Sequence, residues 1–225
     1  LAYAHHVGQS TAGAGTAPLR QETAFKHAFT SNQYNILSMN NIYGSGDFAT
    51  GSEVVVLGWD PADTHTTNFW EELASVELGG ANANLSSGTI TAKKYLWIQA
   101  YIKKTSASTE VTVQYNNDTG SNYARRKSNN GGADGTDVSQ GKIDLEGGAA
   151  SNTFFNMFVI NNSANEKLGI CNMIRVGTAG AGTSPNRTEN VNKWANTSAQ
   201  ITEIDLNSVA STFASGSILK VWGSD

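Results

Sequence analysis

Two stretches, YLWIQAYI at residues 95–102 and EVTVQY at residues 110–115, decide the fold class. The first is dense in aromatic and β-branched side chains, which favour extended backbone. The second alternates strictly and places Val111, Val113 and Tyr115 on one face, as in a strand with one side buried. Both stretches therefore predict β-strands.

Strand signals continue outward from these two stretches, and helix signals are scarce. A short helix is expected only at 68–74, with Thr67 or Asn68 as its cap. The imperfect alternation of Ile201, Ile204 and Leu206 indicates a bulge. Further strands are expected at 53–59, 154–160, 167–176, 201–206 and 217–222.

Connections rich in Gly and Asn separate these runs and supply the chemistry of turns with positive φ. Asn117–Gly120 reads as a hairpin turn, and 129–137 as a long surface loop. Other connections are expected at 147–148, 161–165 and 178–185. The sequence thus predicts an all-β fold: an antiparallel, jelly-roll-like β-sandwich of about eight strands.

The chain also repeats itself. Thr11–Gln33 and Thr178–Gln200 align without a gap at an offset of 167, with 14 of 23 positions identical. The match resumes at an offset of 165, where FATGS at 48–52 answers FASGS at 213–217. The prediction is a complete sandwich at 60–225, preceded at 1–59 by the C-terminal part of a related β module.

A partial module has a physical cost. Residues 1–59 alone would expose an apolar face and unpaired strand edges. We expect a neighbouring subunit or a missing upstream segment to complete them, with the sheet edge of the complete domain as the other option. The chain is accordingly expected to begin inside a longer or processed product.

Composition narrows the class of protein. Charged residues make up only 15% of the chain, the net charge is −4, and Asn, Ser, Thr and 23 Gly replace the missing charge. Such a weakly ionic surface suits an extracellular or virion face. The nearest basic patch, 125–127, reads as a solvated strand end, so no nucleic-acid partner is expected.

Other function classes find little support. The single cysteine, Cys171, excludes an intrachain disulfide and reads as a small buried hydrophobe. No run of 18 apolar residues occurs, so no membrane insertion is expected, and the first ten residues do not read as a signal peptide.

Several residues carry side chains that could in principle serve chemistry. Asp118-Thr119-Gly120 spells an aspartic-protease triplet but lacks a second carboxylate, so a turn is favoured. A Ser-His-Asp site has no G-x-S-x-G elbow. His5, His6, His27 and His65 lack metal-site spacing. A calcium loop could combine Asn116, Asn117 and Asp118 with Asp134 or Asp137. No catalytic residue, cofactor or metal is predicted.

Aromatic side chains leave one alternative open. In a sandwich they usually fill the core, as expected for Trp194, which reads as a core or rim anchor. Exposed on one sheet face, they could instead stack on sugars. The candidates are Tyr95, Trp97, Tyr101, Tyr123 and Trp194.

Three patterns together resemble a β-sandwich module of structural proteins of tailed bacteriophages, especially marine ones. They are YNNDTGSNY at 115–123, KWANTS-x-QITEI at 193–204 and FASGSILKVWG at 213–223. Asn117 stands where the family often has glycine, and Trp222 where tyrosine is usual. The first copy has His27 in place of Trp194 and Leu57 in place of Trp222.

The resemblance implies a structural protein of a tailed-phage virion that is not an enzyme. It would be exposed on the capsid, as a cement or decoration subunit, or sit in the tail fibre or baseplate. Its implied partners are copies of itself, as a homo-oligomer with a trimer among the options, and other virion proteins. The alternative is a carbohydrate-binding module that attaches to host surface glycans. A glycan depolymerase lacks any paired-carboxylate signal.

Overall fold

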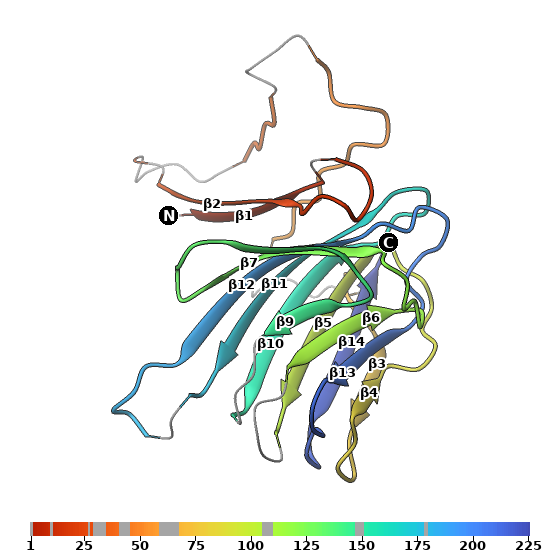
Figure 1. Ribbon diagram of the computed structural model, residues 1–225. Coiled ribbons are helices and arrows are strands. Elements are labelled where there is room, and N and C mark those ends of the chain that lie inside the picture. The colour runs from red at the N-terminus through yellow and green to blue at the C-terminus, as the bar shows by residue number, and fades with distance from the viewer. Residues whose placement is uncertain are drawn as a thin grey trace.

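The fold is all-β. A computed structural model describes residues 2–9, 11–26, 28, 35–40, 46–58, 68–104, 110–146, 151–177 and 180–225. These residues form fourteen strands and no helix, and the strands pair antiparallel (Figure 1). Trp59, Thr67, His27 and His65, and the connection at 147–148, lie outside the described residues.

The large sheet has eight strands in the order β3-β14-β5-β10-β11-β12-β7-β8. Its strands are β3 (Glu71–Glu77), β14 (Ile218–Ser224), β5 (Tyr95–Ile102), β10 (Thr153–Ile160), β11 (Lys167–Arg175), β12 (Asn186–Trp194), β7 (Tyr123–Asn129) and β8 (Gly135–Gln140).

A smaller sheet of four strands, in the order β4-β13-β6-β9, covers one face of the large sheet. Its strands are β4 (Asn84–Ser86), β13 (Ile204–Ser208), β6 (Val111–Tyr115) and β9 (Ile143–Glu146). The core lies between the sheets, where Val113, Leu206, Ile98, Phe155 and Leu219 are fully buried. The antiparallel sandwich is therefore confirmed, with twelve strands instead of about eight; a jelly-roll connectivity stays a prediction.

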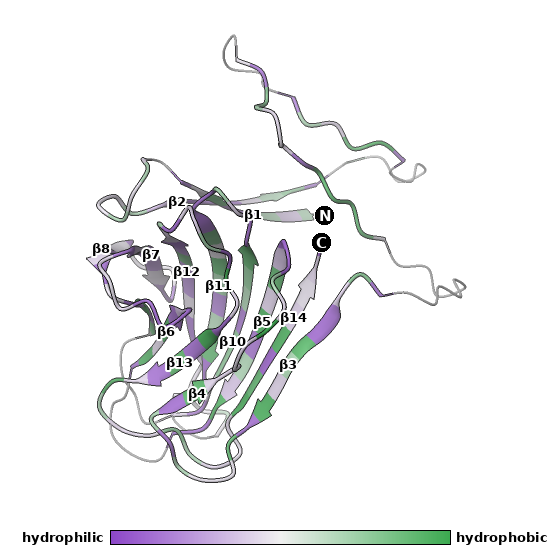
Figure 2. Cartoon of the chain, turned by 90° about the vertical axis from the view of Figure 1, so that its right-hand side faces the viewer, coloured by the Kyte–Doolittle hydropathy of each residue, from purple (hydrophilic) through white to green (hydrophobic). Residues whose placement is uncertain are grey.

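Residue hydropathy varies along the strands of the large sheet (Figure 2). Successive side chains of a strand point to opposite faces, and this alternation sets the two faces of the sheet. In β10 the residues from Thr153 to Val159 at odd positions are buried, while Phe154 and Phe158 are exposed. β5 and β14 repeat the pattern. The large sheet therefore has an inner face in the core and an outer face turned away from the small sheet.

The N-terminal strands form a separate hairpin, β1 (Ala2–Gly8) and β2 (Leu19–Phe25), which lies over the outer face (Figure 1). Its register repeats that of β11–β12. Ala2 pairs with Phe25 as Gly169 pairs with Asn192, and Gly8 pairs with Leu19 as Arg175 pairs with Asn186. Adding 167 to each residue number of the first pair gives the second, the offset seen in the sequence.

The second part of the repeat, 48–52 and 213–217, also has a similar backbone in its two copies. Ser52 N–H donates to Ala49 O at 3.0 Å, and Ser217 N–H donates to Ala214 O at 3.2 Å. Gly51 and Gly216 both have positive φ, 89° and 79°. The segment after Gly51 is nevertheless not a strand, so the predicted strand at 53–59 is wrong for 53–58.

The reason is that a β-strand requires a neighbouring strand with which its backbone can form hydrogen bonds. In β14 the counterparts Leu219 and Val221 are fully buried, whereas Val54 is 53% and Val56 is 69% exposed. Without flanking strands the apolar pattern alone does not fix secondary structure.

The predicted helix at 68–74 is also wrong. Glu71–Glu77 is β3, an edge strand that pairs with β14. A bulge opposite Val221 and Trp222 lets both Leu73 and Ala74 pack against the core. Burial of these side chains outweighs the helix propensity of Glu, Leu and Ala.

Two turn predictions need correction. Asn117–Gly120 is a turn, but it joins β6 in the small sheet to β7 in the large sheet, so it is not a hairpin. The loop predicted at 129–137 is shorter, because β7 ends at Asn129 and β8 begins at Gly135. Asn130 and Gly131 supply the positive φ of this β7–β8 turn.

The irregularity around Ile201 is not a bulge within a strand, because β13 begins only at Ile204 and pairs with β6 in unbroken register. Two asparagines hold the preceding residues. Asn161 Oδ1 accepts from Ile201 N–H at 2.6 Å, and Asn116 Oδ1 accepts from Thr202 N–H at 2.8 Å.

Candidate functional site: the outer face of the large sheet

The outer face carries three rows of side chains that run across the strands. Strand register sets the first row as Trp222, Trp97, Phe158 and Ile170. The same pairing sets a second apolar row of Ile218, Tyr101, Phe154 and Ile174. Between them runs a polar row of Lys220, Gln99, Asn156, Asn172 and Glu189.

Aromatic rings pack together along the first row. Trp97 and Phe158 stack with centroids 5.7 Å apart and planes at 14°. Trp222 lies 6.2 Å and Trp70 5.8 Å from the Trp97 ring. The Trp97 indole N–H donates to Asn156 Oδ1, which ties the first row to the polar row.

The second row is more open to solvent. Tyr101 is 37%, Phe154 42% and Ile174 53% exposed. The hydroxyl of Tyr101 accepts a hydrogen bond from Asn152 Nδ2 at 3.0 Å. Side chains this large and this exposed on neighbouring strands make a contiguous apolar surface.

Charges in the polar row sit at its ends. Lys220 Nζ lies 3.0 Å from Glu72 Oε2 and 5.6 Å above the Trp222 ring. At the other end Glu189 Oε2 lies 2.9 Å from Arg20 Nη1. The middle of the row is therefore composed of uncharged amides that can donate and accept hydrogen bonds.

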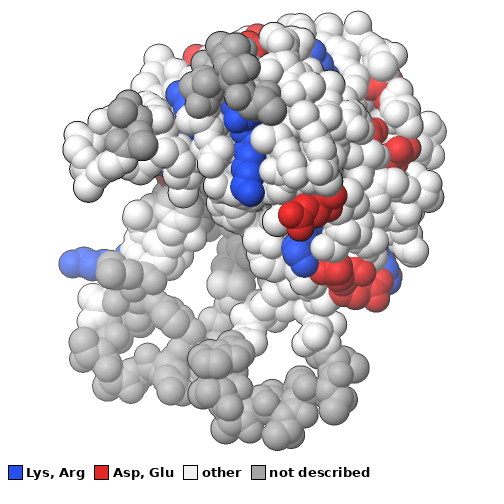
Figure 3. Space-filling model, turned by 90° about the horizontal axis from the view of Figure 1, so that it is seen from below, with Lys and Arg blue, Asp and Glu red and all other residues white. Residues whose placement is uncertain are grey.

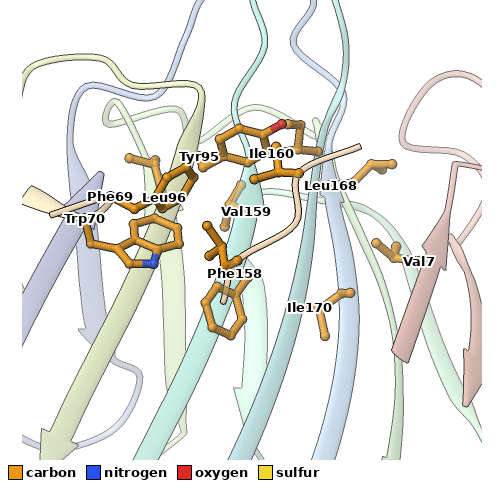
Figure 4. Close-up of a pocket in the computed structure, with 12 residues that line it drawn as sticks. Val7, Phe69, Trp70, Tyr95, Leu96, Phe158, Val159, Ile160, Leu168 and Ile170 are labelled. Carbon is orange, nitrogen blue, oxygen red and sulfur yellow. The ribbon is translucent and has the colours of Figure 1, made fainter. Parts of the chain in front are cut away.

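An apolar cavity of about 350 Å³ opens on the same face (Figure 4). Phe158, Ile170 and Leu168 form its floor, Trp70 stands at one side and Val7 of the hairpin at the other. Val55 and Leu57 also line it. The remaining lining residues are Phe69, Tyr95, Leu96, Val159 and Ile160. Such a cavity can accept an apolar group but offers little to orient a polar one.

The N-terminal hairpin covers the other half of the outer face, over β12 and β7. Ala124 and Val191, which point outward there, are almost fully buried. Lys193 is also fully buried; its Nζ donates to Thr11 O at 2.6 Å and lies 3.5 Å from Glu166 Oε2. Glu166 Oε1 accepts from Gly13 N–H.

Backbone bonds and a guanidinium extend this contact. Ser139 N–H donates to Ala14 O at 2.7 Å, and Arg126 Nε donates to Pro18 O at 2.9 Å. Arg20 pairs with Glu189 and, at 2.7 Å, with Asp134. Burial raises the pKa of Glu189, the nearby Glu22 carboxylate raises it further, and the guanidinium groups of Arg187 and Arg20 oppose both.

Asp118, the centre of the protease-like triplet, is a structural residue. Its Oδ2 accepts from the Trp194 indole at 2.7 Å, and its Oδ1 accepts from Gly120 N–H at 2.8 Å. Burial alone would raise the pKa of Asp118, but these bonds and those from Asn122 outweigh it and lower the pKa below its usual range. The carboxylate thus closes a turn, as expected.

The residues of the possible calcium loop each bond to other partners. Asn116 caps Thr202 and Glu203, and Asn117 Nδ2 donates to Glu203 Oε2. Asp134 pairs with Arg20, and Asp137 pairs with Arg125.

His5 lies 3.7 Å from Glu22, and burial lowers its pKa. His6 lies beside it on β1, and the other two histidines fall outside the described residues. Within the described ranges, no three His, Cys, Asp or Glu side chains gather to hold a metal ion.

The basic run at 125–127 is not a solvated strand end. Arg125 is 7% exposed and pairs with Asp144 at 2.7 Å, and Lys127 pairs with the same carboxylate at 3.0 Å. These cations are neutralised on the inner face of β7. Seen from below, charged side chains form small groups on a mostly uncharged surface (Figure 3).

The five sugar-stacking candidates divide between the two faces. Tyr123 and Trp194 lie in the core, where their rings stack 6.3 Å apart, so Trp194 is an anchor as predicted. Tyr95, Trp97 and Tyr101 lie on the outer face. Sequence reasoning missed Trp70, Trp222, Phe154 and Phe158 at this site. Residue alternation in β10 and β14, once registered with β5, would have placed the last three there.

In the part of the chain that the structure describes, no helix has the length and apolarity needed to cross a membrane. Comparisons of the chain with protein-family models, with curated proteins and with solved structures return no match.

Proposed function

We propose that this protein is a non-enzymatic structural subunit of a tailed-phage virion. It acts by assembly contacts, on the capsid surface as a cement or decoration protein or in the tail fibre or baseplate. Its partners are copies of itself and other virion proteins. The sequence resemblance motivates the virion assignment, and the exposed second row on the outer face supports an assembly role.

The physical argument rests on exposed apolar area. Phe154 and Ile174 lie side by side on β10 and β11 and are about half exposed, next to Tyr101 on β5. Elsewhere, the described residues 35–40 and 46–58 carry further exposed apolar side chains, among them Ile36, Leu37, Phe48 and Val56. Contiguous apolar surface of this kind marks a protein–protein contact, since burying it between subunits is favourable.

Purified particles test the location. Mass spectrometry of particles and immunogold labelling with antibodies against this chain should both detect it. Absence of the protein from purified particles overturns the virion assignment.

The contact itself is tested by Phe154→Ser with Ile174→Ser, which should lower the oligomer size measured by sedimentation. Val209→Ser, which changes an apolar residue of similar exposure just after β13 of the small sheet, is the matched control. Because both targets are half exposed, the double variant should unfold at nearly the wild-type temperature. An unchanged oligomer would remove this face from the contact.

A carbohydrate-binding role is the second candidate, and one observation favours it. The amide row of Gln99, Asn156 and Asn172 lies between two aromatic or apolar rows, which suits a sugar's apolar faces and hydroxyl groups.

A glycan array with the wild-type chain tests this role. Binding should fall with Tyr101→Ala and with Asn156→Ala but persist with Tyr3→Ala, which removes an exposed ring from the hairpin instead. An array without any bound glycan leaves the outer face to protein contacts alone.

A further inference from the structure

One eight-residue segment occurs twice in this chain, in two different surroundings. Gly13–Arg20 reads GAGTAPLR and Gly180–Arg187 reads GAGTSPNR, with six identical positions. The first copy is docked on the sandwich, where Ala14 is 8% and Ala17 is 7% exposed. The second copy is exposed from Gly180 to Pro185.

The two segments share a backbone conformation as well as a sequence. Gly13 has φ of 86° and Gly180 of 97°, a region that favours glycine. Each segment runs into the second strand of a hairpin, and the two hairpins have the same register at an offset of 167. The exposed copy therefore resembles the docked copy at this glycine and at the start of the strand that follows.

Docking of the first copy depends on features that the second retains. Glu166 accepts from the N–H of Gly13, Ser139 donates to the carbonyl of Ala14, and Arg126 donates to the carbonyl of Pro18. These bonds use backbone atoms at positions where the second copy has Gly180, Ala181 and Pro185.

The one charged side chain in the segment is also retained. Arg20 pairs with Glu22, Glu189 and Asp134, and its counterpart Arg187 lies 3.3 Å from Glu189 of its own strand. The two differences are mild. Ser184 replaces Ala17 with one added hydroxyl, and Asn186 replaces Leu19, which is 53% exposed and so contributes little to the docked contact.

We propose that Gly180–Arg187 is a docking surface, and that its partner is another copy of this β-sandwich module. The matching receiving surface consists of Glu166, Lys193, Ser139, Arg126 and the acidic pair Glu189 and Asp134. Complementary charge and backbone pairing select this partner, because the receiving surface already binds the near-identical first copy. The proposal deepens the assembly function proposed above, rests on it, and names the contact.

Such a contact joins different surfaces of the two modules. The exposed loop Gly180–Pro185 of one module and the receiving surface of the next would form a heterologous, head-to-tail interface, which propagates as a ring or an open array. In the wild-type chain the N-terminal hairpin occupies the receiving surface of the same molecule. The loop of a second molecule can therefore dock only on a module whose receiving surface is not covered by a hairpin.

The test frees that surface in the full chain. Arg cannot fit in the buried site of Ala14, and Glu at position 20 would face Glu189 and Asp134, so Ala14→Arg with Arg20→Glu should displace the hairpin. Two proteins are made in this background, one with Ala181→Cys and one with Ser139→Cys. Because Ala14 O and Ser139 N are 2.7 Å apart in the docked copy, the two cysteines should form an intermolecular disulfide.

Controls separate specific docking from general stickiness. Ala14→Cys with Ser139→Cys in an otherwise wild-type chain should form the disulfide within one molecule. Gly79→Cys, on an exposed turn, replaces Ala181→Cys as the mismatched partner. Arg187→Glu, added only to the Ala181→Cys protein, should abolish the Ala181–Ser139 dimer, since it reverses the charge that would face Glu189 and Asp134 of the receiving molecule and leaves that molecule's own Arg187–Glu189 pair intact.

A dimer that exceeds the Gly79 control and is lost with Arg187→Glu supports the proposal. A yield equal to that control, or one insensitive to Arg187→Glu, overturns it. Arg20→Glu alone, a milder change, repeats the test if circular dichroism shows the double variant unfolded. Particle labelling with the wild-type chain is independent of this result, so failure of the docking surface and failure of the virion assignment are distinguishable.

Discussion

The indole N–H of Trp194 donates to Oδ2 of Asp118 at 2.7 Å, which links a buried ring on β12 to the turn between β6 and β7. The same ring lies 5.9 Å from Tyr115 and 6.3 Å from Tyr123, the residues on either side of that turn. The chain crosses from the small sheet to the large sheet at this point, so the carboxylate secures the connection between the two layers.

Replacing Asp118 with Ala should lower the free energy of unfolding by about 1–3 kcal/mol, because the indole and the Gly120 N–H lose their acceptor. Urea denaturation at pH 7 measures the loss. Asp118→Asn retains an acceptor oxygen and should cost less; an equal cost for both variants would contradict a role for the bond to the indole.

The lowered pKa of Asp118 also makes stability depend on pH. A carboxylate with a pKa lower in the folded than in the unfolded chain stabilises the fold above the unfolded value of about 3.9. This contribution is lost as the pH falls through the folded-state pKa. Between pH 5 and pH 2, the denaturation midpoint of the wild-type chain should therefore fall more steeply than that of Asp118→Asn. Parallel curves would show that Asp118 does not titrate as inferred.

Cys171 should be inert in the folded protein. Its side chain is 1% exposed and burial raises the pKa of its thiol to about 12, so the reactive thiolate is scarce at pH 8. A thiol reagent should label it only as the chain unfolds, and the labelling rate should rise with urea. Rapid labelling of the native protein would place the thiol outside the core.

Gly169 should not tolerate a side chain. A Cβ there would lie 2.5 Å from Oδ1 of Asn192, its partner on β12. Gly169→Ala should lower the free energy of unfolding by about 1–3 kcal/mol through overpacking. The double variant with Asn192→Ala should recover part of that loss. Additive costs would mean that the two side chains do not meet.

Lys193 and Glu166 should be strongly coupled. Both are buried where the N-terminal hairpin meets the outer face, so Lys193→Met leaves an unpaired carboxylate and should cost about 3–5 kcal/mol. Lys193→Met with Glu166→Met removes both charges and should cost less than the single change. Denaturation of Lys193→Met, Glu166→Met and the double variant measures the coupling. A double variant that loses at least as much stability as the two single variants together would refute it.

The sequence predicts the strands that carry dense apolar side chains and misses those that do not. Residues 95–102 match β5 at both ends, and β10 and β11 lie within one residue of their predicted bounds. By contrast β12, NRTENVNKW, has a polar sequence although most of its residues are buried. Its inner Asn190 can be buried because it donates a hydrogen bond to Asp144 O, and the hairpin covers its outer face. Its partners are distant in sequence, so no local pattern indicates them.

The candidate site was only partly predictable for a related reason. Trp97 and Tyr101 could be named from composition, but their face depends on how β5 registers with β10 and β14. The repeat identified the first hairpin. The position in which that hairpin docks depends on Lys193, Glu166 and Arg126, and nothing in the sequence distinguishes these residues from ordinary surface charges.

The paired glycine loops give this chain an internal reference. Gly13–Arg20 and Gly180–Arg187 are nearly identical in sequence. The first is packed against the sandwich, whereas the second is exposed to solvent from Gly180 to Pro185. Amide exchange or protease cleavage compared between them reports shielding alone, with the intrinsic chemistry of the peptide nearly cancelled. If an assembly covers the second loop, its exchange or cleavage rate should fall towards that of the first loop. The ratio of the two rates would then report association from within a single molecule.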